Sequence, residues 1–360
     1  MKILCLIDTL DFGGGAERQI AGLAGLLHEK KYEVVLASYH KHNREKMIYE
    51  RYGIKSELIE CGNSFYNKLF SVLKFIQKGN FDVVIAYKDG ATMIACLCKI
   101  IGCKFKLIVS ERNTTQKMTF RERLKFMLYR VADVIVPNSQ SQGEFIKNKF
   151  PYLINKLNVI TNFVDTNLFK PAVNHSYSST RKILVVGRIN PQKNIERFIN
   201  VVRLLKKNSV PVSFDWYGGV YVNTEKYAEF IQQHYKEIDI SDYLTFKGDT
   251  PNISDVYKQY DIFCLPSLYE GFPNVICEAM SSGKPILCSK VCDNPTIVED
   301  GVNGFLFNPF DEYDMYNVIK KIINTDTSVL AKMGSKSREM AEKNFSEEAF
   351  VQKYIKLIEN

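Results

Sequence analysis

Short runs of continuous apolar residues alternate along this chain with segments whose apolar residues recur every three or four positions. The apolar run at residues 2–7 is followed by a loop and an amphipathic segment at 16–27, and the run at 182–187 is followed in the same way by one at 195–205. Continuous apolar runs are typical of parallel strands buried on both faces, and the wider spacing is typical of helices. The pattern therefore predicts two α/β halves of the same design. Further strands are predicted at 32–37, 83–86, 106–110, 134–137 and 157–160 in the first half, and at 212–217, 244–246, 262–265, 285–288 and 305–307 in the second.

The domain organisation follows from the chain length and from one polar segment. A chain of 360 residues is too long for one ordinary core. Residues 167–179 contain Pro171 and a serine-rich stretch and are typical of a linker. We predict two doubly wound, Rossmann-like domains, at 1–171 and 172–345, that face each other across a cleft, followed by a final helix at 346–360. Ligands of open parallel sheets bind at the carboxyl ends of the strands, so functional side chains are expected there.

Composition argues against several classes of protein. The nine cysteines include no C-x-x-C pair and mostly lie in apolar runs, so we predict free thiols in a reducing cytosol. The five histidines show no spacing typical of metal ligands, and no metal site is predicted. No apolar stretch reaches the ~20 residues that a transmembrane helix needs. The first eight residues fit a strand better than a signal peptide, because Asp8 interrupts the apolar run early.

The net charge of +8 is unevenly distributed. Residues 1–171 contain 26 Lys and Arg against 16 Asp and Glu, whereas residues 172–360 contain 22 against 24. A basic first half predicts an anionic partner, with a merely solvated basic face as the alternative. No motif typical of nucleic-acid binding accompanies the charge, so an anionic membrane surface or a pyrophosphate-linked lipid within it fits better. The densest basic run consists of Lys104, Lys106, Arg112, Lys117, Arg121, Arg123, Lys125 and Arg130.

Two carboxylates, Glu270 and Glu278, lie eight residues apart around a Gly-Phe-Pro turn between a predicted strand and a predicted helix. We predict Asn274 as the N-cap of that helix, which places Glu278 four residues later on the same face. Carboxylates accept hydrogen bonds from sugar and ribose hydroxyls, and the N–H groups of a helix N-terminus suit phosphate. The combination predicts a nucleotide-sugar site. For the bare carboxylate pair, a solvated helix start is the alternative.

Two further loops follow the first strand of each half. In the second half, Arg188 and Lys193 follow Gly187, and two cations that converge on one point would neutralise a diphosphate. An ordinary charged surface loop is the alternative. In the first half, three glycines at 13–15 would let the backbone approach a ligand closely. This loop lacks the last glycine of a dinucleotide-binding G-x-G-x-x-G motif, because Arg18 stands in its place.

These segments resemble glycosyltransferase family 4, whose members are retaining enzymes of the GT-B fold. Residues 270–278 match the E-x7-E signature of the family, residues 187–193 match its G-R-x4-K element, and residues 11–18 resemble its G-G-x-E-R loop. The resemblance covers nearly the whole chain and is strongest at 180–310. It implies a nucleotide-sugar donor that is more often UDP- than GDP-linked, no metal and no cofactor. It also implies that the final helix crosses back to the first domain.

The resemblance further implies a role for each motif residue. Arg188 and Lys193 would neutralise the departing diphosphate in place of a metal ion, and Glu278 would hold the ribose hydroxyls. Glu270 would hold hydroxyls of the donor sugar and stabilise a transition state with oxocarbenium character. Either Gly14 or Gly15 would make the closest approach to the donor. The remaining donor contacts are implied at Gly187, Gly248, Gly271, Phe272 and Asn274.

One segment, Ser110-Glu111-Arg112-Asn113, departs from the usual family pattern, which often places a histidine there to contact the donor sugar. This version resembles a subset of the family that assembles bacterial surface polysaccharides. Glu111 is a candidate catalytic residue in place of the histidine, and a structural ion pair is the alternative. Ser139 and the preceding Asn138 are candidate cleft-lining groups, and an N-cap role for Ser139 fits equally well.

Through this resemblance, the sequence predicts a cytoplasmic enzyme on the inner face of the plasma membrane. It would transfer a hexose or N-acetylhexosamine to a polyprenyl-diphosphate-linked glycan of a capsule, exopolysaccharide or O-antigen. A transferase with a soluble acceptor is one alternative, and a non-hydrolysing UDP-sugar epimerase of the same fold is another. The epimerase would need acid and base groups in the cleft. A non-enzymatic scaffold of the same fold should have lost one of the four charged motif residues, and all four are present.

Overall fold

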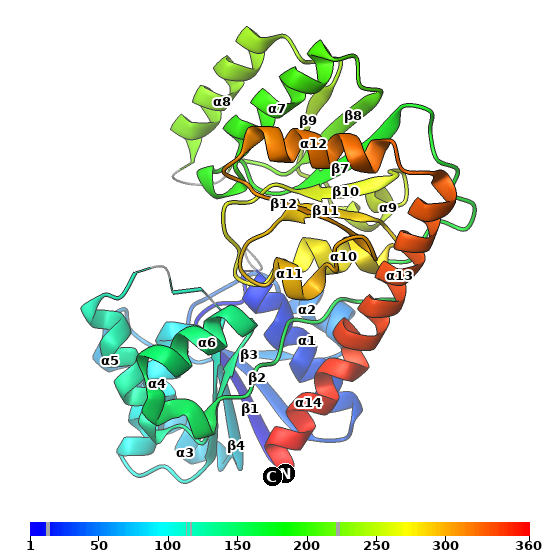
Figure 1. The fold of residues 1–360 in the computed structure, drawn as a ribbon. Coiled ribbons are helices and arrows are strands. Elements are labelled where there is room, and N and C mark those ends of the chain that lie inside the picture. Colours follow the sequence, from blue (N-terminus) through cyan, green and yellow to red (C-terminus); the bar gives the residue numbers. More distant parts are fainter. Residues whose placement is uncertain (12–14, 113, 116, 221–223) are drawn as a thin grey trace. The chain divides into compact units, whose positions relative to one another are not determined.

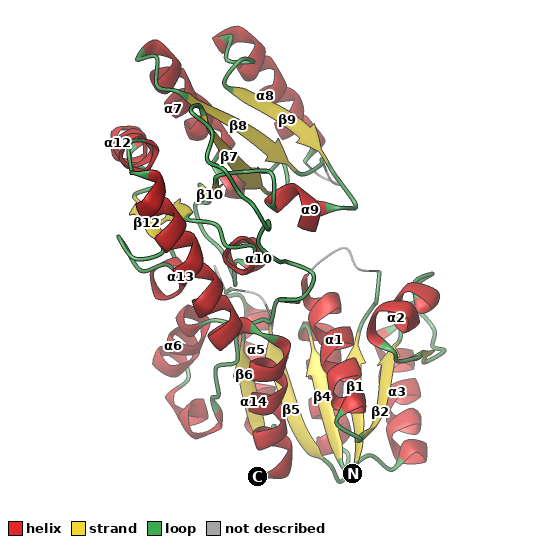
Figure 2. Ribbon diagram, turned by 90° about the vertical axis from the view of Figure 1, so that its right-hand side faces the viewer, coloured by secondary structure: helices red, strands yellow, loops and turns green. Residues whose placement is uncertain are grey.

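The computed structural model describes residues 1–11, 15–112, 114–115, 117–220 and 224–360. The contacts among them divide the chain into two compact units. The first unit comprises Met1–Asn162 with Glu347–Asn360, and the second comprises Phe163–Ser346. Each unit is built on one parallel sheet with helices on both faces (Figures 1 and 2).

In the described part of the first unit, six strands form a parallel sheet in the order β3-β2-β1-β4-β5-β6. The central strand β1 buries five of its six residues, as its continuous apolar run predicts, and pairs with β2 and with β4. The strand order reverses between β1 and β4, which makes the carboxyl ends of these two strands the expected ligand position. The strands are β1 (Lys2–Ile7), β2 (Glu33–Ser38), β3 (Ser56–Leu58), β4 (Val83–Tyr87), β5 (Lys106–Glu111) and β6 (Val134–Pro137).

The helices of the first unit form two groups. In one group, α1 contacts both α2 and α14. In the other group, α4 contacts both α3 and α5. Right-handed crossovers in the two directions from β1 place these groups on opposite faces of the sheet, and Figure 1 shows α4 and α5 on the side away from α1 and α14. The helices are α1 (Gly15–Glu29), α2 (Glu45–Tyr52), α3 (Phe65–Gly79), α4 (Asp89–Ile100), α5 (Phe120–Leu128), α6 (Gln140–Lys149) and α14 (Glu347–Glu359), with 3-10 turns η1 (Tyr129–Val131) and η2 (Pro151–Lys156).

The predicted strand at 157–160 is wrong. Leu157 forms an isolated bridge with Ile135, and the backbone N–H of Asn158 donates to Ile135 O at 2.9 Å. The turn η2 ends at Lys156, and the unit's first segment ends at Asn162. The Ile160 N–H also donates to Pro137 O at 3.1 Å, so residues 157–160 run beside the edge strand β6, but they form only an isolated bridge and not a ladder.

The second unit repeats the design with the strand order β12-β11-β10-β7-β8-β9 among its described residues. Alternate residues of β7 point to opposite faces, so Ile183 and Val185 join the core under α7 and α12, whereas Leu184 joins the core under α10 and α13. Here the order reverses between β7 and β10. The strands are β7 (Arg181–Val186), β8 (Val212–Tyr217), β9 (Leu244–Gly248), β10 (Ile262–Leu265), β11 (Ile286–Ser289) and β12 (Gly304–Phe307).

The helices of the second unit lie between and after these strands. They are α7 (Ile195–Lys207), α8 (Glu225–Ile238), α9 (Ile253–Tyr257), α10 (Asn274–Ser281), α11 (Asn294–Ile297), α12 (Glu312–Ile323) and α13 (Thr327–Phe345), with the 3-10 turn η3 (Pro191–Lys193).

The last helix, α14, packs on the first unit. The Tyr354 hydroxyl lies 2.9 Å from the Tyr87 hydroxyl of β4, and Lys30 pairs with Glu348 at 2.8 Å. The buried Arg112 guanidinium donates to Tyr354 Oη at 2.6 Å and to Asn162 Oδ1 at 2.7 Å. Arg112, directly after β5, thus binds both α14 and Asn162, the last residue of the unit's first segment.

Candidate active site

The two predicted donor loops of the second unit leave the sheet from neighbouring strands. The loop with Arg188 and Lys193 follows β7, and the loop with Glu270 follows β10, which pairs directly with β7. The strand order reverses between these two strands, so the connections that follow them run in opposite directions. The crevice between such connections is where ligands of open parallel sheets bind. The topology therefore brings together two motifs that are 77 residues apart in the sequence.

The two motifs contact each other directly. Lys193 Nζ donates to Glu270 Oε1 at 2.7 Å, and both side chains are largely buried. Gln192 Nε2 donates to Tyr269 O at 2.8 Å and lies 3.4 Å from the other carboxylate oxygen, Glu270 Oε2. The Glu270 N–H donates to the Cys292 thiol at 3.5 Å. Contacts to both carboxylate oxygens and to the backbone N–H of Glu270 thus fix the orientation of this side chain.

Sequence reasoning missed Gln192 and Cys292. Gln192 occupies one of the unspecified positions between Arg188 and Lys193, and Cys292 follows a different strand, β11. No spacing in the sequence links either residue to Glu270. The position of Cys292 in the loop that follows a parallel strand, at the carboxyl edge of the sheet, was the available signal.

The loop after β7 is tightly packed. The Asn190 side chain accepts a hydrogen bond from the Lys193 N–H at 3.2 Å and caps the turn η3. A Cβ atom added to Gly187 would lie 3.0 Å from Lys193 Cδ and Cε. Trp216 Nε1 donates to Gly187 O at 2.8 Å. The small residue at 187 therefore allows the lysine stem to lie along the loop toward Glu270.

The helix α10 carries Glu278 but begins differently from the prediction. Pro273, not Asn274, is the N-cap, and among the described residues its side chain makes no capping hydrogen bond. The Pro273 carbonyl already accepts hydrogen bonds from Ile276 N at 2.9 Å and Cys277 N at 3.4 Å, so the helix starts one residue earlier than predicted. The Tyr257 hydroxyl donates to Glu278 Oε2 at 3.0 Å, and burial together with this carboxylate raises the pKa of Tyr257.

The remaining donor positions differ in what they offer. The Phe272 ring is buried against Phe345, with ring centroids 5.7 Å apart, so only its backbone remains for a ligand. Gly271 lies beside it in the loop that leads into α10. Gly248 ends β9 with φ +72°, and no atom of the described residues lies within 4 Å of an added Cβ. Its left-handed backbone favours glycine, and the described residues leave the space next to it open.

The first unit gathers charged side chains at its own strand reversal. Lys88, directly after β4, donates to Glu17 Oε1 at 2.6 Å and lies 3.2 Å from Asp8 Oδ1, directly after β1. Burial opposes the charge on Lys88, but the two carboxylates outweigh it and raise the pKa of Lys88. Glu17 of α1 thus forms an ion pair with Lys88 at this strand reversal. Of the two candidate glycines, Gly15 begins α1, and Gly14 lies outside the described residues.

Glu111 lies at the buried end of β5 and is 2% exposed. Lys125 of α5 donates to Glu111 Oε2 at 2.9 Å, and the Tyr129 hydroxyl donates to Glu111 Oε1. Burial raises the pKa of Glu111, and the Lys125 ammonium partly offsets that effect. This is the structural ion pair that the sequence left as the alternative, and the catalytic role of Glu111 stays a prediction.

Two other predictions in the first unit are resolved by local geometry. Lys125 is 3% exposed and also pairs with Glu122 and Asp89, so its assignment to a basic surface is wrong. Helical spacing turns position 125 inward with Phe126, whereas its basic neighbours Arg121 and Arg123 are exposed. Ser139 is confirmed as the N-cap of α6, because its hydroxyl accepts a hydrogen bond from Gln142 N at 3.2 Å.

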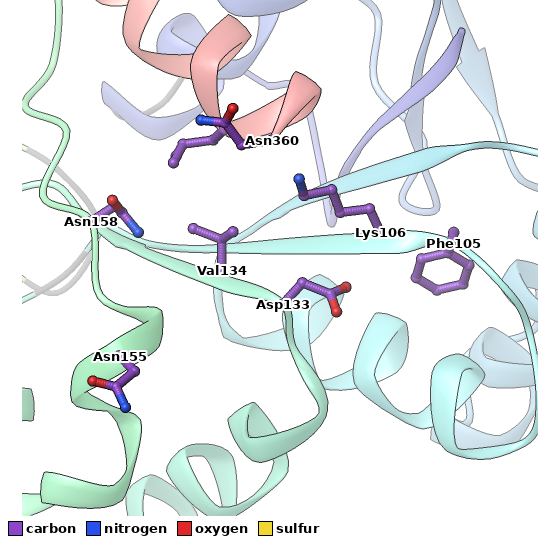
Figure 3. Close-up of a pocket in the computed structure, with 8 residues that line it drawn as sticks. Phe105, Lys106, Asp133, Val134, Asn155, Asn158 and Asn360 are labelled. Atoms are coloured by element: carbon purple, nitrogen blue, oxygen red, sulfur yellow. The ribbon is translucent and has the colours of Figure 1, made fainter.

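A cavity of about 570 Å³ also lies in the first unit, lined by Lys106, Asp133, Asn155, Asn158 and the chain end (Figure 3). Phe105 and Lys106 stand at the start of β5, and Asp133 and Val134 stand at the start of β6. The cavity is therefore at the amino ends of the strands. It is separate from the carboxyl edge that carries the residues described above.

Comparison with known proteins identifies the family of both parts of the chain. Residues 168–345 match the family described as Glycosyl transferases group 1, and residues 13–168 match Glycosyltransferase Family 4. An Escherichia coli UDP-Gal:alpha-D-GlcNAc-diphosphoundecaprenol alpha-1,3-galactosyltransferase is 31% identical over 291 residues, which cover 75% of this chain and 73% of the relative.

A more distant relative and a solved structure extend the match along the chain. A Campylobacter jejuni alpha-1,4-N-acetyl-D-galactosaminyltransferase acting on a PP-undecaprenol-linked glycan is 24% identical over 337 residues, with 91% and 90% coverage. The crystal structure of Anabaena HepE in complex with UDP has a TM-score of 0.86 at 22% identity, and each chain is fully covered. The chain therefore belongs to glycosyltransferase family 4 and is a glycosyltransferase with the GT-B fold.

Proposed function

We propose that this enzyme transfers a sugar, with retention of anomeric configuration, from a UDP-linked donor to an undecaprenyl-diphosphate-linked glycan. The reaction would serve the assembly of a bacterial surface polysaccharide. The names of the Escherichia coli and Campylobacter jejuni relatives support an acceptor of this kind, and the first of them names a UDP-linked donor.

One observation carries the proposal: the Lys193–Glu270 ion pair lies where the strand order of the second unit reverses. The donor diphosphate would lie against Arg188 and Lys193, whose charges stabilise the negative charge that develops on the leaving group. Glu270 would accept hydrogen bonds from the donor sugar. Its negative charge would also stabilise positive charge at the anomeric carbon. Neither step requires a metal ion or another cofactor.

The remaining donor contacts follow the same arrangement. Glu278, oriented by Tyr257, would accept hydrogen bonds from the ribose hydroxyls. Gly248 would leave room for the nucleobase beside β9, and the backbone of Gly271, Phe272 and Asn274 would line the sugar and phosphates. Gly187 would keep the loop close to the diphosphate. In the first unit, Gly14 or Gly15 stays a predicted donor contact.

We further propose that the enzyme works in the cytoplasm as a peripheral protein on the inner face of the plasma membrane. A lipid-linked acceptor would be presented there, and the exposed basic residues of the segment 104–130 would be attracted to anionic lipids, whereas Arg112 and Lys125 of the predicted run are buried. Across the helices that the structure describes, none is long and apolar enough to cross a membrane.

A panel of nucleotides tests the donor assignment. Thermal unfolding of the purified protein is measured with UDP, GDP and a set of UDP- and GDP-sugars. A ligand at 100 times its Kd stabilises the folded state by about 2.7 kcal/mol, which is easily seen as a rise in Tm. We expect stabilisation by UDP and by one UDP-sugar, and loss of both in Lys193→Ala. Stabilisation by GDP alone, or by none of the ligands, would reject the UDP assignment.

A further inference from the structure

The helix α5 presents apolar side chains to solvent. Phe120 is 83% exposed, Leu124 is 39% exposed and Met127 is 57% exposed. At 3.6 residues per turn, positions 120, 124 and 127 fall within an arc of about 60° on one side of the helix. A helix of a globular protein normally turns its apolar stripe to the core and its polar residues outward, and this outer stripe reverses that pattern.

The opposite side of α5 is fully used inside the unit. Phe126 is buried and stacks on Phe150, with ring centroids 4.5 Å apart. Lys125 points inward to Glu111, Glu122 and Asp89. The helix is therefore anchored beside α4 by its inner side (Figure 1), and the exposed stripe is not needed for that packing.

Every charged side chain that is exposed at residues 104–130 is basic. Arg121 and Arg123 are exposed and, by helical spacing, flank the stripe on its two sides. Glu111 and Glu122 are the only acidic residues at 104–130, and both pair with the buried Lys125. Lys104, Lys117 and Arg130 are further exposed basic residues of the same segment. The two carboxylates of the segment pair with Lys125 and not with these residues.

We propose that α5 inserts Phe120, Leu124 and Met127 into the surface of an anionic lipid bilayer, with Arg121 and Arg123 in contact with the headgroups. Apolar side chains above basic ones are typical of helices that lie in a membrane interface, where binding combines buried apolar area with attraction to anionic lipids. The proposal rests on the proposed membrane association and adds the element that makes the contact. It also makes that contact partly apolar, so salt alone would not release the protein.

The test compares three variants of the full chain by sedimentation with vesicles of phosphatidylcholine and phosphatidylglycerol. Phe120→Ser/Leu124→Ser/Met127→Ser removes the stripe, and Arg121→Gln/Arg123→Gln removes the flanking charge. Phe310→Ser/Tyr313→Ser is the matched control, because these side chains are 63% and 72% exposed in the second unit. Circular dichroism and Tm verify that each variant is folded.

We expect the stripe variant to lose about tenfold or more of its vesicle partitioning, and the control variant to bind like the parent. At about 0.5 M salt, where the Debye length falls to a few ångströms, the parent should retain part of its binding and the stripe variant none. In Phe120→Trp, addition of vesicles should shift the emission to shorter wavelength, and brominated lipids should quench it. The native Trp216 is fully buried in the second unit and gives a constant background.

Three outcomes would overturn the inference. The stripe variant could bind vesicles like the parent. The tryptophan introduced by Phe120→Trp could remain exposed to water while the protein sediments with the vesicles. Alternatively, the parent could fail to bind vesicles but self-associate, and the stripe variant could lose that self-association. This result would assign the stripe to contact with a second copy of the chain. UDP binding is measured in parallel. If the parent protein does not bind UDP, the proposed function is rejected. If the stripe variant binds vesicles as well as the parent does, only this inference is rejected.

Discussion

Lys193 Nζ and Glu270 Oε1 lie 2.7 Å apart, so the cation assigned to the diphosphate and the carboxylate assigned to the donor sugar form one ion pair. Because both side chains are largely buried, each helps to compensate the charge of the other. Removing the Lys193 cation should therefore also disturb the carboxylate that is assigned to the donor sugar.

The first prediction concerns the two cations. Arg188→Ala or Lys193→Ala should lower kcat/KM by roughly 30- to 1000-fold, because losing a charge-assisted contact to the diphosphate costs about 2–4 kcal/mol. Steady-state kinetics with the donor identified by the nucleotide panel measures the effect. Near wild-type activity in the double variant would contradict the assignment of both residues.

The second prediction separates the two carboxylates. Glu278→Gln should weaken UDP binding, whereas Glu270→Gln should mainly lower kcat, since contact with the reacting sugar strengthens as positive charge develops. Calorimetric titration of UDP into both variants measures the difference. Tyr257→Phe is the matched control: it removes the hydrogen bond to Glu278 and should give a smaller loss of UDP affinity than Glu278→Gln. An equal loss of UDP affinity at positions 270 and 278 would refute the division.

The strands were the most predictable part of this fold, because continuous apolar runs leave a parallel strand few alternatives. The predicted strand at 157–160 failed since its pairing depends on where η2 ends, which no periodicity shows. The short strand β3 was missed because its pattern is not apolar: only Ser56 is even partly buried, and Glu57 and Leu58 are exposed.

The sequence was equally uneven about the site. Motif spacing predicted Arg188, Lys193, Glu270 and Glu278 as the charged residues of the donor site, and the topology accounts for the contact of two of them. The spacing could not predict that Gln192 and Cys292 also contact Glu270, because those contacts join three separate loops. Nor could it distinguish a catalytic Glu111 from a paired one. That distinction depends on Lys125 turning inward from α5, which only the packed helix decides.

The third prediction tests the role of Glu111. If the residue is structural, Glu111→Gln should destabilise the fold, and Lys125→Met should do so by about 3–5 kcal/mol, because it leaves buried carboxylates without their cation. Urea unfolding measures both changes. A fall in transfer rate in Glu111→Gln with an unchanged unfolding midpoint would instead support the catalytic role.

The fourth prediction concerns metal ions. Transfer should continue in excess EDTA, because Arg188 and Lys193 supply the positive charge that a metal would bring to the diphosphate. The measurement is product formation with and without chelator, followed by addition of magnesium or manganese. Complete loss of activity with EDTA and its recovery with either metal would reject the metal-free mechanism.

The fifth prediction concerns the pH dependence of stability at Lys284. Its ammonium is buried and donates to Tyr260 O at 2.7 Å, and burial, partly opposed by Asp261, lowers the pKa of Lys284 from 10.5 to about 8. Between these two values, the unfolded chain binds the proton more strongly than the folded protein does. The contribution of Lys284 to the free energy of unfolding should therefore rise with pH from about 8 to 10.5 and stay constant below and above that window. Lys284→Met removes the titrating group but keeps an apolar chain of similar length. Urea unfolding at a series of pH values measures the free energy of unfolding of both proteins. As pH rises through the window, the parent should gain stability relative to the variant. A pH-independent difference would show that Lys284 titrates alike in the folded and unfolded chain.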